Sequence, residues 1–457
     1  MSETGLTRDL CQIIRATTFE SLGDECVQRV KQAIKDGIAV AVAGCKAPQI
    51  AISVAHMRSL GGAPQASVWG WGFKASVVQA AYINGCATHV LDFEPMWSPP
   101  THSISSTVPV AVALAEVQPV TGKQLLTAVA KGMEIQGRLQ YAGNQYVAEH
   151  FKFHPPGVSG VIGSAVVAAD LLGLELQGMQ HAIGLAASRA GSLLANIGSM
   201  TKCTHCGTAA ASGLDAALLA KRGFTANPDV IEAPKGLADI YYGESFDPAK
   251  LLAYGRPYRV VDPGLAIKLF PSQYATHYVI SAALEVAPQI TDKTSIVRLR
   301  VIAPALKHLD RPNPIDGLEG KHSLQYVAAA ALLDDAVRID TFMDERRFRK
   351  DVVDLLARTE LVMDASIPLP LDKMHMGVEV ILSDGRTLRA TCRAPKGTWG
   401  VPVEPRDHRA KLEDCFGRIL VGRQVAEVID LLDHIEELDA TGIRKIVALI
   451  AGSDTLR

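Results

Sequence analysis

The segment 92–102, DFEPMWSPPTH, holds the residues of this chain that are best suited to chemistry. It combines Asp92, Glu94 and His102 with an indole ring, and its prolines prevent it from forming a helix. Small, apolar runs that are typical of helices flank it on both sides. We therefore predict a loop that presents Asp92 and His102 close to helix ends, where rigid elements can hold catalytic groups.

A second histidine stands before prolines in FKFHPPG, residues 151–157. Pro155 and Pro156 restrict the backbone, so we expect the ring of His154 to be held still at the entrance to an apolar helix. An immobilised imidazole beside a helix N-terminus suits anion binding or proton transfer. The alternative interpretation is an ordinary surface histidine in a turn.

A lysine, Lys202, lies in the polar segment 198–207, GSMTKCTHCG, which precedes a long Ala-rich helical run. A lysine at a helix N-terminus opposes the helix dipole, so a ligand for its ammonium, such as a substrate carboxylate, is the interpretation that we favour. Cys203, His205 and Cys206 offer three metal ligands, but no second Cys/His pair lies at zinc-ribbon spacing. We predict no metal site.

Two further segments carry candidate polar groups. Lys268 begins KLFPSQYATH, residues 268–277, at the predicted junction of two domains, a place where pockets are favoured. A solvated lysine is the alternative there. Tyr326 closes HSLQY at the start of a predicted helix, and the alternative for it is a packing role with a tethered hydroxyl.

Phosphate-binding and nucleophile motifs are missing from the sequence. No GxGxxG follows a strand pattern, and neither GxxxxGK[ST] nor GxSxG occurs. Dinucleotides and nucleoside triphosphates therefore lack their usual binding loops, and the nucleophile elbow of α/β-hydrolases is excluded. What remains is a cofactor-free mechanism built from His, Lys, Asp and Tyr.

The elements that must position these groups are mainly helical up to about residue 253. Ala, Gly and Val dominate this part, and aromatic residues make up 5% of the chain, so close helix packing through small side chains is expected. The clearest helical runs are 77–90, 123–141, 158–172 and 209–222.

The pattern changes after Pro257. Residues 296–302 alternate as in a strand, and residues 377–392 read as a hairpin around the turn SDGR. Helical runs at 322–334 and 345–359 lie between them, a combination typical of a small α+β domain. After residue 400 the chain becomes helical again, at 406–421 and 425–438, so these last helices are expected to rejoin the first domain.

Composition limits the remaining possibilities. A chain of 457 residues exceeds what one hydrophobic core normally supports, which predicts two domains. The 46 basic and 48 acidic residues are well mixed and give a net charge of −2, which argues against nucleic acid as a partner. Eight scattered cysteines form no disulfide framework, and neither a secretory signal nor a membrane span is evident. We expect a soluble, cytoplasmic protein.

Together, these segments resemble the MmgE/PrpD family of 2-methylcitrate dehydratases, cis-aconitate decarboxylases and iminodisuccinate epimerases. The resemblance covers nearly the whole chain, and the joint occurrence of short motifs makes it specific. The motifs are Leu91-Asp92-Phe93 with Thr101-His102, Phe153-His154-Pro155-Pro156-Gly157, Met200-Thr201-Lys202 with His205 and Gly207, Lys268-Leu269-Phe270-Pro271 with Thr276-His277, and His322-Ser323-Leu324-Gln325-Tyr326.

The resemblance implies a mainly α fold, in which a large all-α helical domain carries an inserted, smaller α+β lid domain. We place the helical domain at residues 1–265 plus 401–457 and the lid domain at 266–400. The family also implies a homodimer without a cofactor. One departure is that Glu94-Pro95-Met96 replaces the family's usual Asp-Asp-Thr, so a thioether replaces a polar contact.

The resemblance further implies a set of site residues and a substrate class, a di- or tricarboxylic acid. The expected catalytic residues are Asp92, His102, His154 and Tyr326, and the expected substrate-binding residues are Lys202, Lys268 and His277. In this hypothesis His102 and His154 transfer protons, Asp92 orients and charges one of them, the lysines hold carboxylates, and Tyr326 donates a hydroxyl.

We predict a lyase, either a dehydratase or a decarboxylase, that stabilises negative charge on a carbon next to a carboxylate. An epimerase or racemase of a dicarboxylate such as iminodisuccinate is the alternative within the family. A non-catalytic binding protein is a third possibility, and the gathering of several cations around one pocket argues against it unless an anion offsets their repulsion.

Overall fold

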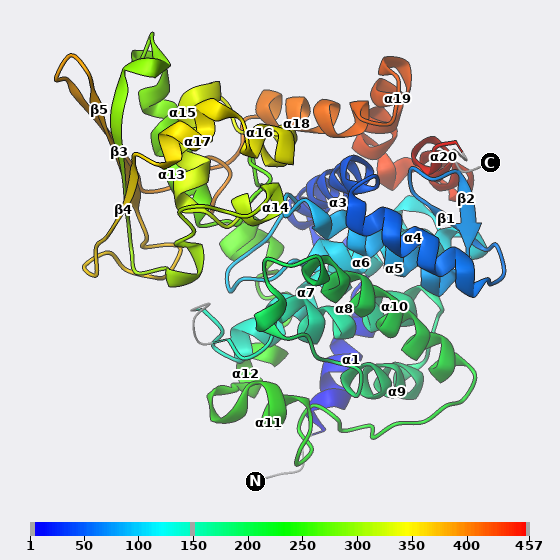
Figure 1. The fold of residues 1–457 in the computed structure, drawn as a ribbon. Coiled ribbons are helices and arrows are strands. Elements are labelled where there is room, and N and C mark those ends of the chain that lie inside the picture. Colours follow the sequence, from blue (N-terminus) through cyan, green and yellow to red (C-terminus); the bar gives the residue numbers. More distant parts are fainter. Residues whose placement is uncertain (1–4, 147–150, 454–457) are drawn as a thin grey trace. The chain divides into compact units, whose positions relative to one another are not determined.

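The computed structural model describes residues 5–146 and 151–453. Its chain forms two compact units. The first, which we call the helical unit, comprises Met1–Val90, Glu94–Ile267 and Glu404–Arg457; the second, the mixed unit, comprises Leu91–Phe93 and Lys268–Val403. Helices dominate the secondary structure, so the predicted mainly α fold class is confirmed (Figure 1).

The helical unit is built from fifteen α-helices among the described residues, with one small hairpin. The helices are α1 (Leu6–Ala16), α2 (Phe19–Leu22), α3 (Asp24–Gly44), α4 (Pro48–Leu60), α5 (Val77–Val90), α6 (Ser103–Val117), α7 (Gly122–Ala142), α8 (Pro155–Leu171), α9 (Leu176–Ala187), α10 (Thr201–Lys221), α11 (Leu237–Tyr241), α12 (Pro248–Leu252), α18 (Pro405–Gly417), α19 (Gly422–Asp433) and α20 (Ala440–Ala451). The hairpin pairs β1 (Ala66–Val68) with β2 (Phe73–Ala75).

Small residues allow the central helices to approach closely. A Cβ atom built at Gly207 of α10 would lie 2.3 Å from Cys86 Sγ of α5, and one at Gly213 would lie 2.4 Å from Ser164 Cβ of α8. No side chain larger than hydrogen fits at either crossing, since interiors are close-packed. The predicted dense packing of Ala- and Gly-rich helices is therefore present around α10.

The C-terminal helices belong to the helical unit. Asp36 of α3 is fully buried and accepts hydrogen bonds from Lys411 Nζ at 2.8 Å and His408 Nε2 at 3.0 Å, both from α18. A buried carboxylate requires such partners, because an unpaired buried charge is strongly destabilising. Further on, Gly70 donates its backbone N–H to the carbonyl of Ile450 at 2.8 Å, so α20 adjoins the β1–β2 hairpin.

The mixed unit contains a four-stranded sheet in the order β4-β3-β5-β6. The strands are β3 (Ile296–Ala303), β4 (Thr359–Met363), β5 (Met376–Leu382) and β6 (Thr387–Cys392), and the helices of the unit are α13 (Thr276–Val286), α14 (Gly317–Gly320), α15 (Leu324–Asp334), α16 (Asp344–Arg347) and α17 (Lys350–Leu356). β3 pairs parallel with β4 and antiparallel with β5, and β5 pairs antiparallel with β6.

The predicted hairpin in this unit is confirmed. Its turn places Gly385 at φ 86°, a left-handed backbone that glycine adopts without strain. The predicted strand 296–302 corresponds to β3. In contrast, the helix predicted over 345–359 is wrong in its last part: the structure has two short helices, α16 and α17, and then β4, which starts at Thr359.

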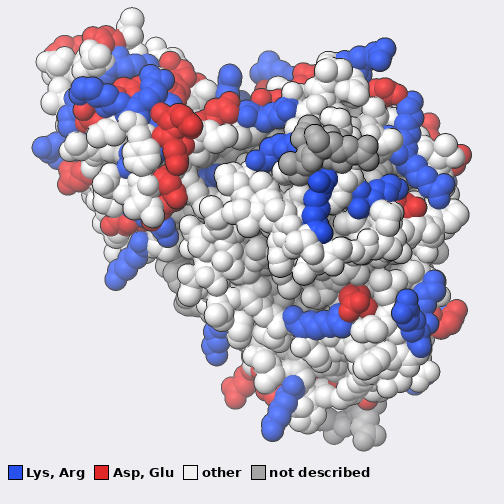
Figure 2. All heavy atoms as spheres, turned by 45° about the vertical axis from the view of Figure 1, so that its right-hand side comes forward, with Lys and Arg blue, Asp and Glu red and all other residues white. Residues whose placement is uncertain are grey.

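The surface charge and the hydropathy of the helices agree with what the composition predicted. Separate groups of Lys and Arg and of Asp and Glu lie between broad uncharged areas on the face drawn in Figure 2, and neither sign forms a continuous field there. Among the described residues no single helix has the length and apolar character to cross a membrane; the bent pair α3 and α4, with 83° between its helices, passes that test by length and composition.

Candidate active site

The loop predicted around residues 92–102 is confirmed, and helices border it on both sides. α5 ends at Val90, and α6 begins at Ser103 with His102 as its N-cap residue. Asp92 has φ 53°, a left-handed conformation that few side chains tolerate but that Asp adopts more readily. Within the helical unit, this loop brings Glu94 and His102 to the end of α5 that carries His89.

Glu94 is the centre of a buried polar group. The same carboxylate oxygen, Oε1, accepts a hydrogen bond from His89 Nδ1, lies 2.8 Å from His102 Nδ1 and accepts from Ser105 Oγ at 3.1 Å. Glu94 is fully buried, as is the side chain of His89. A buried carboxylate in contact with two imidazoles fixes the orientation of both rings.

The ionisation of Glu94 depends on these histidines. Burial opposes its negative charge, but His89 and His102 outweigh burial and hold the pKa of Glu94 well below its usual range. Glu94 is therefore a carboxylate at neutral pH. A fixed negative charge at this point stabilises positive charge that develops on His102 when that ring accepts a proton.

The backbone holds His154 at the start of α8, as its N-cap residue. Its backbone N–H donates to the carbonyl of Ser192 at 3.0 Å, and Pro155 and Pro156 form the first turn. A Cβ at Gly157 would lie 1.9 Å from Ser192 Oγ, so the close approach of the two segments requires glycine there. His154 is 5% exposed, so the surface-turn alternative is wrong.

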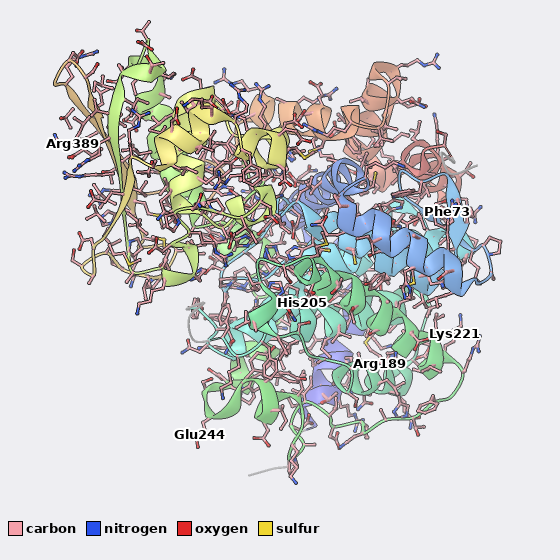
Figure 3. All side chains as sticks on the ribbon, in the orientation of Figure 1. Phe73, Arg189, His205, Lys221, Glu244 and Arg389 are labelled. Carbon is pink, nitrogen blue, oxygen red and sulfur yellow. The ribbon has the colours of Figure 1, made fainter. Side chains whose placement is uncertain are left out.

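The ring of His154 contacts a second imidazole. Its Nδ1 lies 3.0 Å from Nδ1 of His205, which α10 contributes, and the ring centroids are 5.1 Å apart. Figure 3 labels His205 in the interior of the helical unit. The helix starts at Thr201, eight residues before the predicted run at 209–222, so Lys202 and His205 both lie on α10.

Four histidines thus gather in the helical unit. The ring centroid of His89 lies 4.6 Å from that of His102 and 5.7 Å from that of His154, and the centroids of His102 and His154 are 6.1 Å apart. Together with His205, these residues form what we call the histidine cluster. His102 and His154, predicted from distant motifs, are brought together by the fold.

Burial lowers the pKa of three histidines of the cluster, His89, His154 and His205. It lowers the pKa of His89 to about 4 although the charge of Glu94 acts in the opposite direction, and it lowers the pKa of His205 to about 4. The pKa of His154 is also well below its usual range, first because of burial and then because of neighbouring positive charge. The positive charge of Lys202 contributes to all three lowered pKa values.

The cluster also has the ligand types of a metal centre. Ligand atoms of His89, His102 and His154 all lie within 4.8 Å of one another, so these three residues could hold a cation. The charge of Lys202 beside them disfavours a cation. The absence of a metal remains our prediction. Of the three potential ligands in segment 198–207, His205 contacts His154, and Cys203 Sγ contacts the Met200 carbonyl at 3.3 Å.

Asp92 and Lys268 form an ion pair within the mixed unit. Lys268 is 1% exposed; its ammonium donates to the Asp92 carboxylate, to the Asp92 carbonyl at 2.9 Å and to the Ser272 carbonyl at 3.3 Å. The solvated-lysine alternative is therefore wrong. Lys321 Nζ donates to the carbonyl of Leu91 at 2.8 Å, so two buried lysines hold residues 91–93.

Tyr326 and His277 are also buried in the mixed unit. The hydroxyl of Tyr326 donates to the carbonyl of Thr341, and burial raises the pKa of that phenol. This is the tethered hydroxyl of the packing alternative. The ring of His277 contacts those of Phe270 and Tyr274, with centroid distances of 5.2 and 5.1 Å. Catalytic or substrate-binding roles for both remain predictions.

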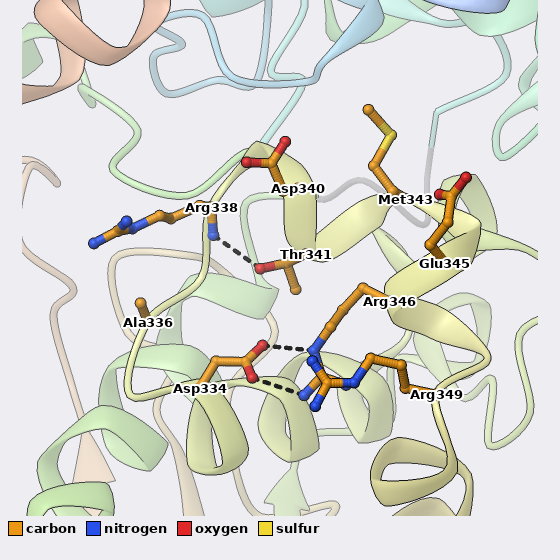
Figure 4. Close-up of a pocket in the computed structure, with 9 residues that line it drawn as sticks. All are labelled: Asp334, Ala336, Arg338, Asp340, Thr341, Met343, Glu345, Arg346 and Arg349. Atoms are coloured by element: carbon orange, nitrogen blue, oxygen red, sulfur yellow. Dashed lines mark hydrogen bonds and ion pairs between the residues drawn. The ribbon is translucent and has the colours of Figure 1, made fainter.

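A cavity of about 600 Å³ in the mixed unit lies around η8 (Ile339–Phe342) and α16, and none of the predicted site residues lines it (Figure 4). Its most buried cation, Arg346, already forms ion pairs with Asp334 at 2.7 Å and Asp351 at 3.0 Å. An anion would have to compete with these carboxylates. The cavity is therefore a poor candidate for a carboxylate site.

The structure adds a second carboxylate to the predicted site. Glu94 contacts His89 and His102, and Asp92, for which the orienting role stays a prediction, pairs with Lys268. His89 and Glu94 were not predicted as site residues. The signal for both was a histidine in the last turn of a helix with an acid five residues later, beyond the helix end.

Comparison with known proteins matches the chain to two family models. The model described as the MmgE/PrpD N-terminal domain matches residues 8–249, and the MmgE/PrpD C-terminal domain matches residues 270–436. All residues of the histidine cluster fall within the first match.

Curated relatives include decarboxylases and a dehydratase. Cis-aconitate decarboxylase of Mus musculus is 29% identical over 447 residues, covering 95% of this chain and 91% of the relative, and that of Homo sapiens is 29% identical over 446 residues, covering 95% and 92%. 2-Methylcitrate dehydratase of Escherichia coli strain K12 is 28% identical over 292 residues, covering 57% of each chain.

Proposed function

Because this chain belongs to the MmgE/PrpD family, we propose that it is a lyase that acts on a small polycarboxylic acid. Decarboxylation of a tricarboxylate such as cis-aconitate is the reaction that we favour. The decarboxylases among its relatives align with 95% of the chain, whereas the dehydratase aligns with 57%. We further propose that the reaction needs no cofactor.

The observation that carries the proposal is the histidine cluster with its buried carboxylate. Loss of CO₂ leaves an electron pair on a carbon next to a carboxylate, and that carbon must then receive a proton. Imidazoles with depressed pKa are neutral at neutral pH, and a positioned neutral imidazole can donate or accept a proton without first losing or gaining one. General acid–base catalysis of this kind contributes about 10²- to 10⁴-fold to rates.

In this proposal each group of the helical unit has one task. His102 and His154 transfer protons, with ring centroids 6.1 Å apart. Glu94 helps to orient His102, because it contacts that ring directly, and Asp92 keeps the orienting role that we predicted. Lys202 attracts a substrate carboxylate, and its charge favours the anionic intermediate.

The groups of the mixed unit would contribute to substrate binding. Lys268 and His277 are proposed to bind carboxylates, and Asp92 and Tyr326 to act beside them. Since the ammonium of Lys268 already contacts three oxygens, a substrate carboxylate would have to replace at least one of them. An isolated buried ammonium would be unfavourable, so the exchange keeps the charge compensated.

A substrate screen tests the proposal. Purified protein is incubated with cis-aconitate, 2-methylcitrate, citrate and iminodisuccinate, and each mixture is followed by NMR. We expect cis-aconitate to be consumed with release of CO₂. His102→Ala should abolish most of this turnover, and unchanged turnover in that variant would remove His102 from the mechanism. Failure to convert any of the four acids would contradict the proposal.

Epimerisation is a second candidate because two proton carriers, His102 and His154, lie close together. One could remove a proton from the α-carbon while the other returns one to the opposite face. Incubation in D₂O distinguishes the reactions. Deuterium at the α-carbon without loss of water or CO₂ would favour an epimerase, and loss of CO₂ would favour the decarboxylase.

A further inference from the structure

His154 and His205 share a hydrogen bond that restricts their protonation. The two Nδ1 atoms are 3.0 Å apart, so one must carry a hydrogen and the other must offer a lone pair. If both nitrogens carried hydrogens, the two would point at each other, and without any hydrogen two lone pairs would repel. The tautomer of one ring therefore sets the tautomer of the other.

The contact with His205 leaves one ring nitrogen of His154, Nε2, for a substrate. Within the described part of the chain, Nδ1 is the ring atom of His154 with a hydrogen-bond partner. Nε2 is the other atom that can exchange a proton with a bound molecule. The backbone of His154 is fixed at the N-cap of α8, and His205 is held on the first turns of α10, so the contact between the rings is preorganised.

We propose that His205 is a positioning residue that donates its Nδ1 hydrogen to Nδ1 of His154, keeps the reactive proton of His154 on Nε2, and relays its replacement during turnover. This inference rests on the proposed function, because the proton that reaches the substrate is the one needed after bond cleavage. It adds a role for His205, which was not among the predicted catalytic residues.

In a decarboxylation, the bond from carbon to carboxyl breaks, CO₂ leaves, and the electron pair stays on the carbon. That carbon forms a bond to the proton of His154 Nε2 as Nδ1 of His154 takes the Nδ1 proton of His205 and Nε2 of His205 takes a proton from solvent water, so neither ring becomes an imidazolate. After the product leaves, Nε2 of His154 takes a proton from water, its Nδ1 proton returns to Nδ1 of His205, and Nε2 of His205 gives its proton back to the hydroxide that it left. The remaining hydroxide takes the one proton that the bulk supplies in each turnover.

This route leaves both imidazoles neutral at the beginning and at the end. A mechanism that stored the proton as a buried imidazolium would work against the burial and positive charge that lower the pKa of both rings. A chain of two neutral imidazoles avoids that cost. The relay is inferred from the contact between the two rings, and the lowered pKa values support it.

The first test needs no substrate and is therefore independent of the proposed function. In protein labelled with ¹⁵N in its histidines, long-range ¹H–¹⁵N spectra at pH 7 report the tautomer of each ring. We expect His205 to carry its hydrogen on Nδ1 and His154 on Nε2, with assignments from His205→Asn and His154→Gln. Finding both rings with hydrogens on Nε2, or the opposite arrangement, would overturn the inference.

The second test uses turnover of the acid identified in the screen. His205→Ala should lower kcat about a hundredfold with a KM within about threefold of wild type, because the variant loses the relay and not the substrate contacts. His205→Asn places an amide donor near the position that Nδ1 of His205 occupies in wild type. This amide should fix the His154 tautomer without relaying a proton, so the kcat of His205→Asn should lie between that of wild type and that of His205→Ala.

A solvent isotope effect separates the relay from a structural role. We expect the effect on kcat to rise in His205→Ala, because proton delivery becomes rate-limiting, and 50 mM imidazole to restore part of the activity. His181→Ala, which removes a half-buried histidine that contacts the Ala226 backbone, is the matched control and should behave as wild type. Wild-type kcat and isotope effect in His205→Ala would refute the relay even if the enzyme is a decarboxylase.

Discussion

One carboxylate oxygen of Glu94 contacts two imidazoles and one hydroxyl. The negative charge beside the histidine cluster therefore depends on this one side chain. Glu94→Gln keeps the shape but removes the charge. We expect kcat to fall about a hundredfold or more, because His102 loses both its orientation and the compensation of its positive form. Steady-state kinetics on the accepted acid measure this change.

A matched control for that variant is Glu116→Gln. Glu116 is a mostly buried carboxylate of the helical unit that accepts from the backbone N–H of Ser67 at 2.6 Å, and its polar partners among the described residues are Ser67 and Lys74. This control is expected to lose stability and to keep its kcat. Equal losses of kcat in both variants would show that burial of a neutral amide, and not the charge of Glu94, explains the effect.

The lowered pKa of His89 should make the stability of the protein depend on pH. Its pKa in the folded protein is about 4, below the ordinary 6.5, so the unfolded chain binds a proton at a pH where the folded protein does not. Stability therefore falls as pH decreases from about 6.5 towards 4, and between pH 7 and pH 5 this residue accounts for about 2 kcal/mol of the loss.

Urea unfolding at both pH values tests this prediction. His89→Gln should show a smaller difference in the free energy of unfolding between pH 7 and pH 5 than wild type. His56→Gln, a change at an exposed histidine of α4, should leave that difference unaltered. A pH dependence that is identical in His89→Gln and wild type would contradict the assigned pKa.

The sequence identified some residues of the cluster and not others, for a physical reason. His154 precedes Pro155, and His102 follows Pro100 by two residues, so a restricted backbone near both is visible in the sequence. Glu94 and His89 meet because α5 ends at Val90 and the chain turns back, which depends on the three-dimensional course of the loop. Glu94 was therefore noticed as a departure from a family pattern rather than as a partner of histidines.

At the scale of elements, the junction between α8 and the segment around Ser192 positions His154. Gly157→Ala would place a methyl group 1.9 Å from Ser192 Oγ and 2.2 Å from the Gly191 carbonyl. Relief of this overlap should cost about 1 to 3 kcal/mol of stability and displace His154. We expect lower turnover together with a lower Tm.

Gly191→Ala provides the control from the opposite side of that junction. A Cβ at Gly191 meets no atom within 4 Å, so this change should alter the free energy of unfolding by less than about 0.5 kcal/mol and leave kcat unchanged. Calorimetric melting and kinetics of both variants give the comparison. A Gly157→Ala protein that melts and turns over like wild type would show that the junction tolerates a methyl group.

Element boundaries were predictable where one pattern dominates. The helix predicted over 77–90 coincides with α5, since apolar and small residues dominate that run. α10 begins earlier than predicted because its first turns contain polar residues, among which His205 and Cys206 point into the interior. β4 was missed because it pairs parallel with β3, more than fifty residues away, and such pairing leaves little local signal.

For the whole molecule, the family resemblance predicts a homodimer. Size-exclusion chromatography with light scattering should give a mass of about twice the 48.8 kDa of one chain. The mass should remain constant over a hundredfold dilution if the interface is of the stable class. A mass of one chain at every concentration would refute this prediction.

The salt bridge of Asp36 with α18 has a consequence for biosynthesis. The helical unit cannot be completed until its last stretch, Glu404–Arg457, has left the ribosome, whereas the mixed unit ends at Val403. Asp36 and Lys411 are separated by 375 residues, so at ordinary elongation rates roughly 19 to 75 seconds pass between their synthesis. During this interval the nascent polypeptide carries an acidic group whose cationic partners do not yet exist. We therefore expect the emerging chain to depend on chaperones until its final helices arrive.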